Sequence, residues 1–358
     1  MTRAAQGGPD GAIDRGRALA ERTRVGERRA LARLLTEVEN RSRAAEGALR
    51  ILYPLAGAAH LVGVTGAPGA GKSTLVAALV GEARKSGRPV AVLAIDPSSP
   101  ITGGAILGDR VRMQAYAGDP DVFIRSMASR GHVGGLATST VAAAAVLDAA
   151  GFPLVFIETV GTGQSEVEVA AIADTTLVVQ APEMGDEVQA IKAGLLEVAD
   201  IVVVNKADRP GADRTASHLR SMLTVGAQHD RAMGDRPRPK RPEVLLASGA
   251  TGTGVPEVLA SLDRREAKRR AAASSDEAEG VGDRARLARA EAQLSGILAE
   301  RLRERLREPG LAAQTDETLR AIAAHEIDPY SAADRLLASL ASTASDAPGG
   351  YERRWTIR

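Results

Sequence analysis

The chain of 358 residues contains no cysteine. This absence excludes disulfide bonds, zinc sites with thiolate ligands and cysteine nucleophiles, and a reducing compartment agrees with it. The five histidines are scattered, and none is paired with another at the spacing of metal ligands. A protein that carries its own store of metal ions for delivery is therefore not indicated.

An excess of charge of one sign is missing as well, because 46 Lys and Arg residues are balanced by 45 Asp and Glu residues. Such a chain has no global field to attract nucleic acid or a membrane surface, and we expect neither as a partner. The first 37 residues are rich in arginine but include acidic residues, and they lack the apolar stretch of a signal peptide. No apolar run approaches membrane-spanning length, so a cytoplasmic location is expected.

The hydrophobic pattern changes along the chain from helical to alternating strand and helix. Residues 12–52 have apolar positions separated by charged residues, which is typical of helices. From Leu61 onward, short apolar runs alternate with helix-length segments. The expected strands lie at residues 61–65, 90–95, 154–157, 175–179, 201–204 and 244–247. Runs that are apolar on both faces predict an α/β fold with a mostly parallel sheet covered by helices.

Composition predicts how the chain is divided into regions. Residues 1–55 would form an N-terminal helical extension, and residues 56–271 the α/β domain. Within that domain, residues 226–242 are rich in Arg, Pro, Asp and Gly and are expected to be an exposed excursion. Residues 272–283 have the small, polar composition of a linker. The remaining regions are a C-terminal helical region at residues 284–342 and a flexible tail at residues 343–358.

Three helices are expected in the C-terminal region. The first is long and charged, and its apolar residues between Leu287 and Leu306 fall on one face. A second is expected over residues 316–327, before Asp328. The third is expected to begin at Ser331 with a start that resembles a capping box.

A glycine-rich segment, GAPGAGKST, follows the first predicted strand and opens a predicted helix. It has the pattern G-x-x-x-x-G-K-[ST] of a phosphate-binding P-loop in the expected context. Its glycines allow successive N–H groups to point at phosphate oxygens, and the helix amino end adds partial positive charge. Lys72 would contact the β- and γ-phosphates, and Ser73 would offer its hydroxyl to Mg²⁺. The predicted nucleotide contacts here are Gly66, Ala67, Pro68, Gly69, Ala70, Gly71, Lys72, Ser73 and Thr74.

The base is predicted by the N-K-x-D tetrad from Asn205 to Asp208, which ends an apolar strand. Asp208 would accept hydrogen bonds from the ring N–H and the exocyclic amine of guanine. Adenine has no donors there and would leave a buried carboxylate unpaired, at a cost of about 1–3 kcal/mol. Lys206 would lie over the base, and Asn205 would tie neighbouring loops together. Main-chain N–H groups of Ser248, Gly249 and Ala250 would reach guanine O6.

Carboxylates near the P-loop are candidates for magnesium binding and hydrolysis. Many GTPases have Asp-x-x-Gly after the strand that ends here at Glu158, and Gly161 keeps the glycine that senses the γ-phosphate. Gln164 would orient the attacking water or lie on a loop surface. Asp96 ends a predicted strand and is placed for Mg²⁺ or water. Asp109 lies in the following loop, where aspartates usually cap turns.

Together these residues resemble the methylmalonyl-CoA mutase-associated GTPases, the MeaB/ArgK family that includes the methylmalonic aciduria type A protein. The resemblance covers about residues 12–342. Its most specific segments are DPSSPITGGAILGDRVRM (Asp96–Met113), ETVGTGQSE (Glu158–Glu166) and GDEVQAIKAGLLEVADIVVVNKAD (Gly185–Asp208).

The resemblance implies that Asp96, Asp109, Glu158 and Gln164 act with Lys72 in Mg²⁺ binding and hydrolysis. It also implies an additional switch over Gly185–Lys192, in which Lys192 would read the nucleotide state. A charge on a solvated helix is the alternative for Lys192. The chain departs from the family at residues 226–242, which are basic and irregular, and at Gly249, where alanine is more usual.

The resemblance further implies a homodimer whose helical arms join the protomers. Family members bind an adenosylcobalamin-dependent acyl-CoA mutase, and they use GTP to gate cofactor loading and to protect the enzyme. Methylmalonyl-CoA mutase is the leading partner, although isobutyryl-type and other acyl-CoA mutases fit equally well. The apolar stripe between Leu287 and Leu306 drifts from a strict heptad, so packing within the protomer competes with a dimer seam.

Three other functions compete with that of a GTPase chaperone. A nickel-delivering GTPase would need a segment rich in His and Cys, which the chain lacks. An ATP-dependent kinase linked to basic amino-acid transport is opposed by the N-K-A-D tetrad. A nucleotide-bound scaffold without hydrolysis would show no Mg²⁺-dependent phosphate release even with a mutase present.

Overall fold

The computed structural model describes residues 9–97, 114–116, 118–129, 135–159, 164–182, 195–230, 241–273 and 282–345. The chain divides into two compact units, Met1–Ala290 and Glu291–Arg358. No helix among these described residues is long and apolar enough to cross a membrane.

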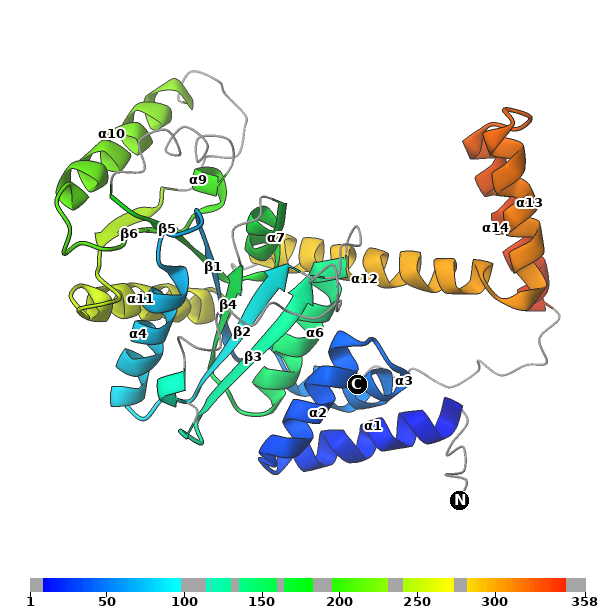
Figure 1. Ribbon diagram of the computed structural model, residues 1–358, viewed down its shortest axis with the longest axis horizontal. Coiled ribbons are helices and arrows are strands. Elements are labelled where there is room, and N and C mark those ends of the chain that lie inside the picture. The colour runs from blue at the N-terminus through cyan, green and yellow to red at the C-terminus, as the bar shows by residue number, and fades with distance from the viewer. Residues whose placement is uncertain are drawn as a thin grey trace. The chain divides into compact units, whose positions relative to one another are not determined.

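The first unit is built on a sheet of seven parallel strands (Figure 1). Its order, β3-β2-β4-β1-β5-β6-β7, places β1 at the centre between β4 and β5. The strands are β1 (His60–Thr65), β2 (Val90–Pro97), β3 (Val122–Ser129), β4 (Leu154–Thr159), β5 (Thr175–Gln180), β6 (Ile201–Val204) and β7 (Glu243–Leu246). The predicted α/β class is confirmed, and the carboxyl ends of the strands share one edge of the sheet.

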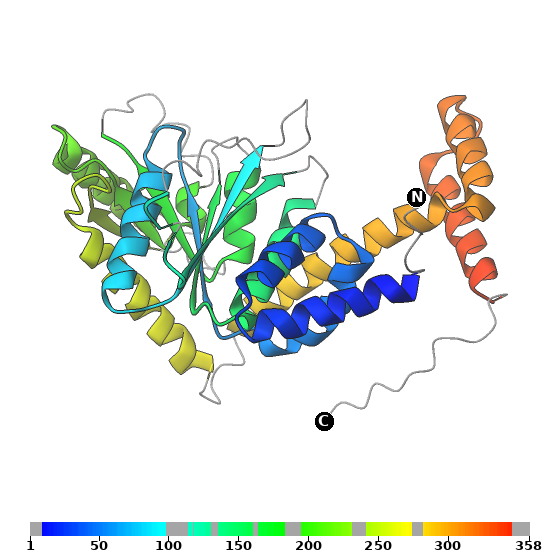
Figure 2. The ribbon, with the colours of Figure 1, turned by 60° about the horizontal axis from the view of Figure 1, so that its bottom comes forward.

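Helices cover both faces of the sheet because the central strands are apolar on both sides. One face packs on α4 (Lys72–Lys85) and α11 (Val255–Ala273). The opposite face is covered by α6 (Gly135–Ala149), α7 (Gln164–Ile172), α9 (Leu195–Val198) and α10 (Ala212–Asp230). Figure 2 shows α4 and α11 on one side of the sheet, and α6 with the N-terminal helices on the other.

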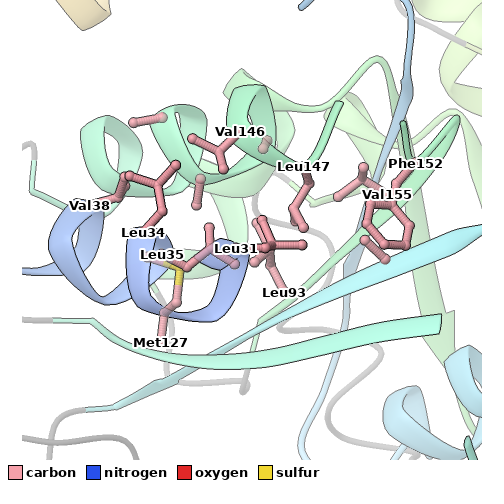
Figure 3. Close-up of a cluster of buried hydrophobic side chains, with 14 of the residues drawn as sticks. Leu31, Leu34, Leu35, Val38, Leu93, Met127, Val146, Leu147, Phe152 and Val155 are labelled. Carbon is pink, nitrogen blue, oxygen red and sulfur yellow. The ribbon is translucent and has the colours of Figure 1, made fainter. Parts of the chain in front are cut away.

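The N-terminal helices belong to the first unit and share its core. They are α1 (Pro9–Arg24), α2 (Arg28–Glu39) and α3 (Arg43–Leu52), followed by the short 3-10 helix η1 (Tyr53–Leu55). In Figure 3 the apolar face of α2, with Leu31, Leu34 and Leu35, points toward Val146 and Leu147 of α6. These three leucines are almost fully buried, and replacing such a side chain with alanine typically costs about 2–5 kcal/mol.

Strand β3 was missed from the sequence because polar residues interrupt its apolar run. Arg125 and Ser126 lie at its middle. Arg125 contacts Glu39 of α2 at 2.7 Å, and the other carboxylate oxygen of Glu39 accepts a hydrogen bond from the Ala128 main chain. A helix from the N-terminal region therefore forms polar contacts with this edge strand. These contacts join distant parts of the chain, so local sequence could not reveal them.

Two predicted irregular segments are partly helical. Helix α10 continues to Asp230, so residues 226–230 belong to a helix and not to an excursion. Residues 231–240 lie outside the described part of the chain. The expected linker is shorter than its composition indicated, because α11 ends at Ala273 and α12 (Gly282–Leu306) begins before residue 283.

The second unit contains the end of α12, with α13 (Pro309–Ala323) and α14 (Pro329–Ser345). The start expected for α13 at residue 316 was wrong, because Pro309 occupies its first turn, a position that favours proline. The start expected for α14 was also wrong. Asp328 caps this helix, accepting hydrogen bonds from the N–H groups of Tyr330 and Ser331 at 2.9 and 3.0 Å.

Helices α1 and α3 approach each other at two glycines. A Cβ atom on Gly16 would fall far inside 3.0 Å of the Ala44 carbonyl, and one on Gly47 would do the same at Ile13. Gly11, also in α1, has open space around its Cβ position. The two glycines of α1 therefore differ in packing although both are helical.

We expect Gly16→Ala to lower the free energy of unfolding by about 1–3 kcal/mol, because the added methyl forces the helices apart. Gly11→Ala is the matched control and should leave stability unchanged or raise it by up to about 1 kcal/mol. Urea unfolding followed by circular dichroism measures both changes. Equal effects of the two substitutions would contradict the close α1–α3 contact.

Candidate functional site

The phosphate loop connects β1 to α4 and requires glycine at two points. Gly66 and Gly71 have φ angles of 132° and 88°, in the region that favours glycine. A Cβ on Gly66 would overlap the carbonyl oxygen of Val179, and a Cβ on Gly71 would lie 2.5 Å from Nδ2 of Asn205. The loop is therefore packed tightly against the ends of β5 and β6.

Lys72 holds its ammonium group inside this loop. Its Nζ donates hydrogen bonds to the carbonyl oxygens of Gly66 at 2.6 Å and Ala67 at 3.1 Å. The residue is buried at the first position of α4, where the helix amino end already favours an anion. The positive charge is thus fixed where a P-loop receives the phosphates of a nucleotide.

Ser73 and Glu158 meet on the α4 side of the sheet. The Ser73 hydroxyl donates to Oε1 of Glu158 at 2.6 Å, and both residues are buried. Mg²⁺ prefers oxygen ligands and usually keeps water and phosphate oxygens beside one or two side chains. These two oxygens fit that donor set. No group of three or more metal-binding side chains occurs among the described residues.

Asn205 joins three loops with one side chain. Its Nδ2 donates to the carbonyl oxygens of Ala70 at 2.9 Å and Gly71 at 3.2 Å. Its Oδ1 accepts a hydrogen bond from the Gly249 N–H at 3.0 Å. The phosphate loop, the N-K-A-D segment and the loop after β7 are therefore held together, as the position of Asn205 in the tetrad led us to expect.

Lys206 crosses from the N-K-A-D segment to the phosphate loop. Its Nζ donates to the Gly69 carbonyl at 2.7 Å, so the aliphatic stem extends from the N-K-A-D segment to the phosphate loop. Its φ angle of 58° is left-handed, which is uncommon for a residue with a side chain. This geometry agrees with a stem that lies along one face of a bound base.

Asp208 is exposed, with its carboxylate hydrogen-bonded to Ser248. That hydrogen bond is the main cause that lowers the pKa of Asp208 below its ordinary value. The carboxylate is therefore ionised and can accept hydrogen bonds at neutral pH. Its exposure differs from the buried carboxylate assumed in the sequence argument, because only a bound base would cover it.

The loop after β7 is closely packed and most of its N–H groups are used. The Ser248 N–H donates to the Thr253 carbonyl at 2.8 Å, and the Gly249 N–H donates to Asn205. Of the three N–H groups expected near guanine O6, only that of Ala250 has no such bond within the described residues. A Cβ on Gly249 would lie 2.8 Å from the main chain of Leu75 in α4, which explains glycine at this position.

Several expected site residues lie at the margin of what the structure describes. Asp96 ends β2, and Gln164 begins α7, but the description does not extend to their side chains. Asp109, Gly161 and Lys192 lie outside the described residues.

The expected site residues that the structure does bring together come from the phosphate loop, the end of β4, the N-K-A-D tetrad and the loop after β7. They are Gly66 to Thr74, Glu158, Asn205, Lys206, Asp208 and Ser248 to Ala250. Sequence reasoning missed Gln180, a buried polar residue at the end of β5. The one sequence signal for this residue was an amide side chain at the end of a strand whose five preceding residues are threonine or apolar.

A P-loop next to an N-K-A-D tetrad, at the carboxyl edge of a parallel sheet, defines a nucleotide-binding protein of the GTPase class. The family described as methylmalonyl Co-A mutase-associated GTPase MeaB matches residues 31–309. The chain belongs to this family, which confirms the resemblance seen in its motifs.

The names of several relatives support GTPase activity. A Pyrococcus abyssi protein named as a GTPase is 45% identical over 324 residues, 89% of this chain and 95% of its own. GTPase ArgK of Escherichia coli is 40% identical over 241 residues, 66% of this chain and 72% of ArgK. The mitochondrial methylmalonic aciduria type A homolog of Caenorhabditis elegans is 38% identical over 205 residues, 56% of this chain and 50% of that protein. The chain therefore binds guanine nucleotide and hydrolyses GTP.

A solved structure extends the agreement to the fold. The crystal structure of an LAO/AO transport system kinase has a TM-score of 0.60 and 27% sequence identity. The match covers 91% of this chain and 97% of the other.

We expect Asp208→Asn to reduce the preference for GTP over ATP by about 10-fold or more, because an amide cannot accept both guanine hydrogen bonds. Asp213→Asn, at an exposed carboxylate in the first turn of α10, is the matched control. Competition of GTP and ATP against a fluorescent GTP analogue measures the preference. An unchanged preference in Asp208→Asn would contradict the assignment of the base contact.

Proposed function

We propose that this GTPase is the chaperone of an adenosylcobalamin-dependent acyl-CoA mutase, and that methylmalonyl-CoA mutase is the partner. The family name states an association with that mutase, and the Caenorhabditis elegans relative is named for methylmalonic aciduria. The nucleotide would gate cofactor loading and protect the mutase from inactivation. The observation that carries the proposal is the family match across residues 31–309.

Catalysis would be positional and electrostatic, as is usual for phosphoryl transfer. Lys72, fixed by two loop carbonyls, would hold the β- and γ-phosphates and offset their charge. Mg²⁺, when bound, would supply charge neutralisation for the phosphates. Ser73 and Glu158 would hold this ion, and their contact at 2.6 Å supports that role.

The remaining hydrolysis residues are proposed from the family pattern. Asp96 and Asp109 would assist Mg²⁺ binding, Gln164 would orient the attacking water, and Gly161 would sense the γ-phosphate. Lys192 would report the nucleotide state within an additional switch. Intrinsic turnover would be slow, and the mutase would change it by binding one nucleotide state more tightly than the other.

A homodimer is proposed through the C-terminal helical region, residues 284–342. The apolar stripe of α12 supports it, because Leu294, Leu298 and Leu302 are 57%, 57% and 38% exposed. Large side chains exposed in a row along a helix often mark an interface. The site itself lies in the first unit.

The alternative functions receive less support from the described residues. A nickel-delivering GTPase would need a cluster of metal-binding side chains, and the described part of the chain contains none with three or more such residues. The solved relative is described as a transport system kinase. The N-K-A-D geometry, with Asp208 ionised beside Ser248, favours guanine over the adenine of ATP.

We expect Glu158→Gln to lose most of the gain in GTP affinity that Mg²⁺ provides, because a neutral amide is a poorer ligand for Mg²⁺. Glu257→Gln, at an exposed position of α11, should keep the full gain. Calorimetric titration with and without Mg²⁺ measures the gain for each protein. An undiminished gain in Glu158→Gln would remove this residue from the metal site.

The partnership is tested with purified methylmalonyl-CoA mutase and the full-length GTPase. We expect a stable complex whose affinity differs at least 5-fold between a non-hydrolysable GTP analogue and GDP, because the partner must distinguish two nucleotide states. Surface-coupled mutase and a titration of the GTPase in each nucleotide state measure the two affinities. If the mutase neither binds nor changes the rate of GTP hydrolysis, the chaperone proposal falls while the GTPase assignment stands.

A further inference from the structure

The end of β5 is the place where the phosphate loop and the guanine motif meet. The main-chain carbonyl of Gln180 accepts a hydrogen bond from the Asn205 N–H at 2.7 Å. One residue earlier, the Val179 carbonyl lies so close to Gly66 that no Cβ fits there. A shift of Val179 and Gln180 would therefore move both the phosphate loop and the N-K-A-D segment.

The side chain of Gln180 is buried at this junction without a hydrogen bond. The residue is 1% exposed, and neither Nε2 nor Oε1 has a hydrogen-bond partner among the residues that the structure describes. An amide of this kind is costly to bury, because it gives up its hydrogen bonds to water. Because most buried polar groups in native structures are hydrogen-bonded, such an exception needs an explanation, and a functional role is one.

Thr65 repeats this situation on the neighbouring strand. It is the last residue of β1, directly before Gly66, and it is fully buried. Its hydroxyl also has no hydrogen-bond partner within the described part of the chain. Thr65 pairs with Val178, and Gln180 follows Val178 by two residues. Because strand side chains alternate between faces, Thr65 and Gln180 are on the same face.

That face is the one covered by α7. Two residues before Thr65 and on the same face of β1, Gly63 lies against Val169 of α7 and against Ala173, which directly follows α7. Lys72, Ser73 and Glu158 gather on the other face, beside α4. Thr65 and Gln180, which we call the buried polar pair, therefore lie on the α7 face of neighbouring strands, on the opposite face from the side chains that would touch nucleotide or Mg²⁺.

We propose that Thr65 and Gln180 are positioning residues whose side-chain hydrogen bonds form in the nucleotide-bound state. Bound nucleotide fixes the phosphate loop and the N-K-A-D segment, and this pair lies where both contact β5. A group that is bonded only in one state favours that state. The pair would therefore destabilise the nucleotide-free protein and add to nucleotide affinity. The inference rests on guanine-nucleotide binding and is independent of the mutase.

The test compares isosteric or similar-sized apolar substitutions in the full-length protein. Gln180→Leu and Thr65→Val remove the polar atoms of the pair, and Gln180→Met is a second apolar variant for Gln180. Thr140→Val in α6 is the control, because Thr140 is also fully buried with no hydroxyl partner within the described residues. Melting temperature is measured with and without a non-hydrolysable GTP analogue and Mg²⁺, and affinity for the analogue by fluorescence titration.

In the nucleotide-free state we expect Gln180→Leu, Gln180→Met and Thr65→Val to melt at or above the wild-type temperature. Their stabilisation by the analogue should be smaller than that of wild type. Gln180→Leu should bind the analogue about 10-fold more weakly, equivalent to about 1.4 kcal/mol. Thr140→Val should bind it as wild type does.

Three results would overturn the proposal. One is a lower melting temperature of both Gln180 variants without nucleotide, which would show that the amide already stabilises that state. Another is wild-type affinity in both Gln180 variants and in Thr65→Val. The last is an equal loss of affinity in Thr140→Val. The mutase takes no part in these experiments, so none of these results bears on the chaperone proposal. A failure of the chaperone proposal would likewise leave the proposal for Thr65 and Gln180 unaffected.

Discussion

The hydrogen bonds of the Asn205 side chain are the interaction on which the nucleotide site depends. This side chain is 2% exposed and joins the phosphate loop to the loop after β7 through Ala70, Gly71 and Gly249. Hydrogen bonds shielded from water are stronger, and leaving such groups unbonded is costly. The motifs predicted to bind phosphate and base are therefore held in place together, which would lower the ordering that nucleotide must supply on binding.

Close contacts at three glycines set the geometry around this bridge. Gly66 contacts the end of β5, Gly71 contacts Asn205, and Gly249 contacts the first turn of α4. A side chain at Gly66 would push the phosphate loop away from β5, and one at Gly71 would meet the Asn205 side chain. A side chain at Gly249 would push the loop after β7 away from α4. The apolar core beneath the loops is closely packed. The parallel strands end at one edge of the sheet, so the loops that follow them start from fixed positions.

The elements that could be predicted from sequence are those with strong local signals. Six of the seven strands contain short apolar runs, and these six were predicted. The helix α4 begins directly after the last glycine of the P-loop. Strand β3 was missed because Arg125 is polar where local patterning requires an apolar residue, and its partner Glu39 is 86 residues away. The capping role of Asp328 was passed over in favour of Ser331, because neighbouring polar residues offer competing helix starts.

The sequence by itself determined the motifs from which the chemistry of the site is predicted. Lys72 and Ser73 belong to a P-loop pattern between a strand and a helix, and the N-K-A-D tetrad ends another strand, so both can be recognised from local sequence. It also indicated the family through long motifs. Only the tertiary structure decided which N–H groups near the base are already bonded, that Glu158 meets Ser73, and that Gln180 is buried without a hydrogen bond among the described residues. The physical reason is that burial and hydrogen bonding between strands depend on sheet order, which local sequence patterns do not specify.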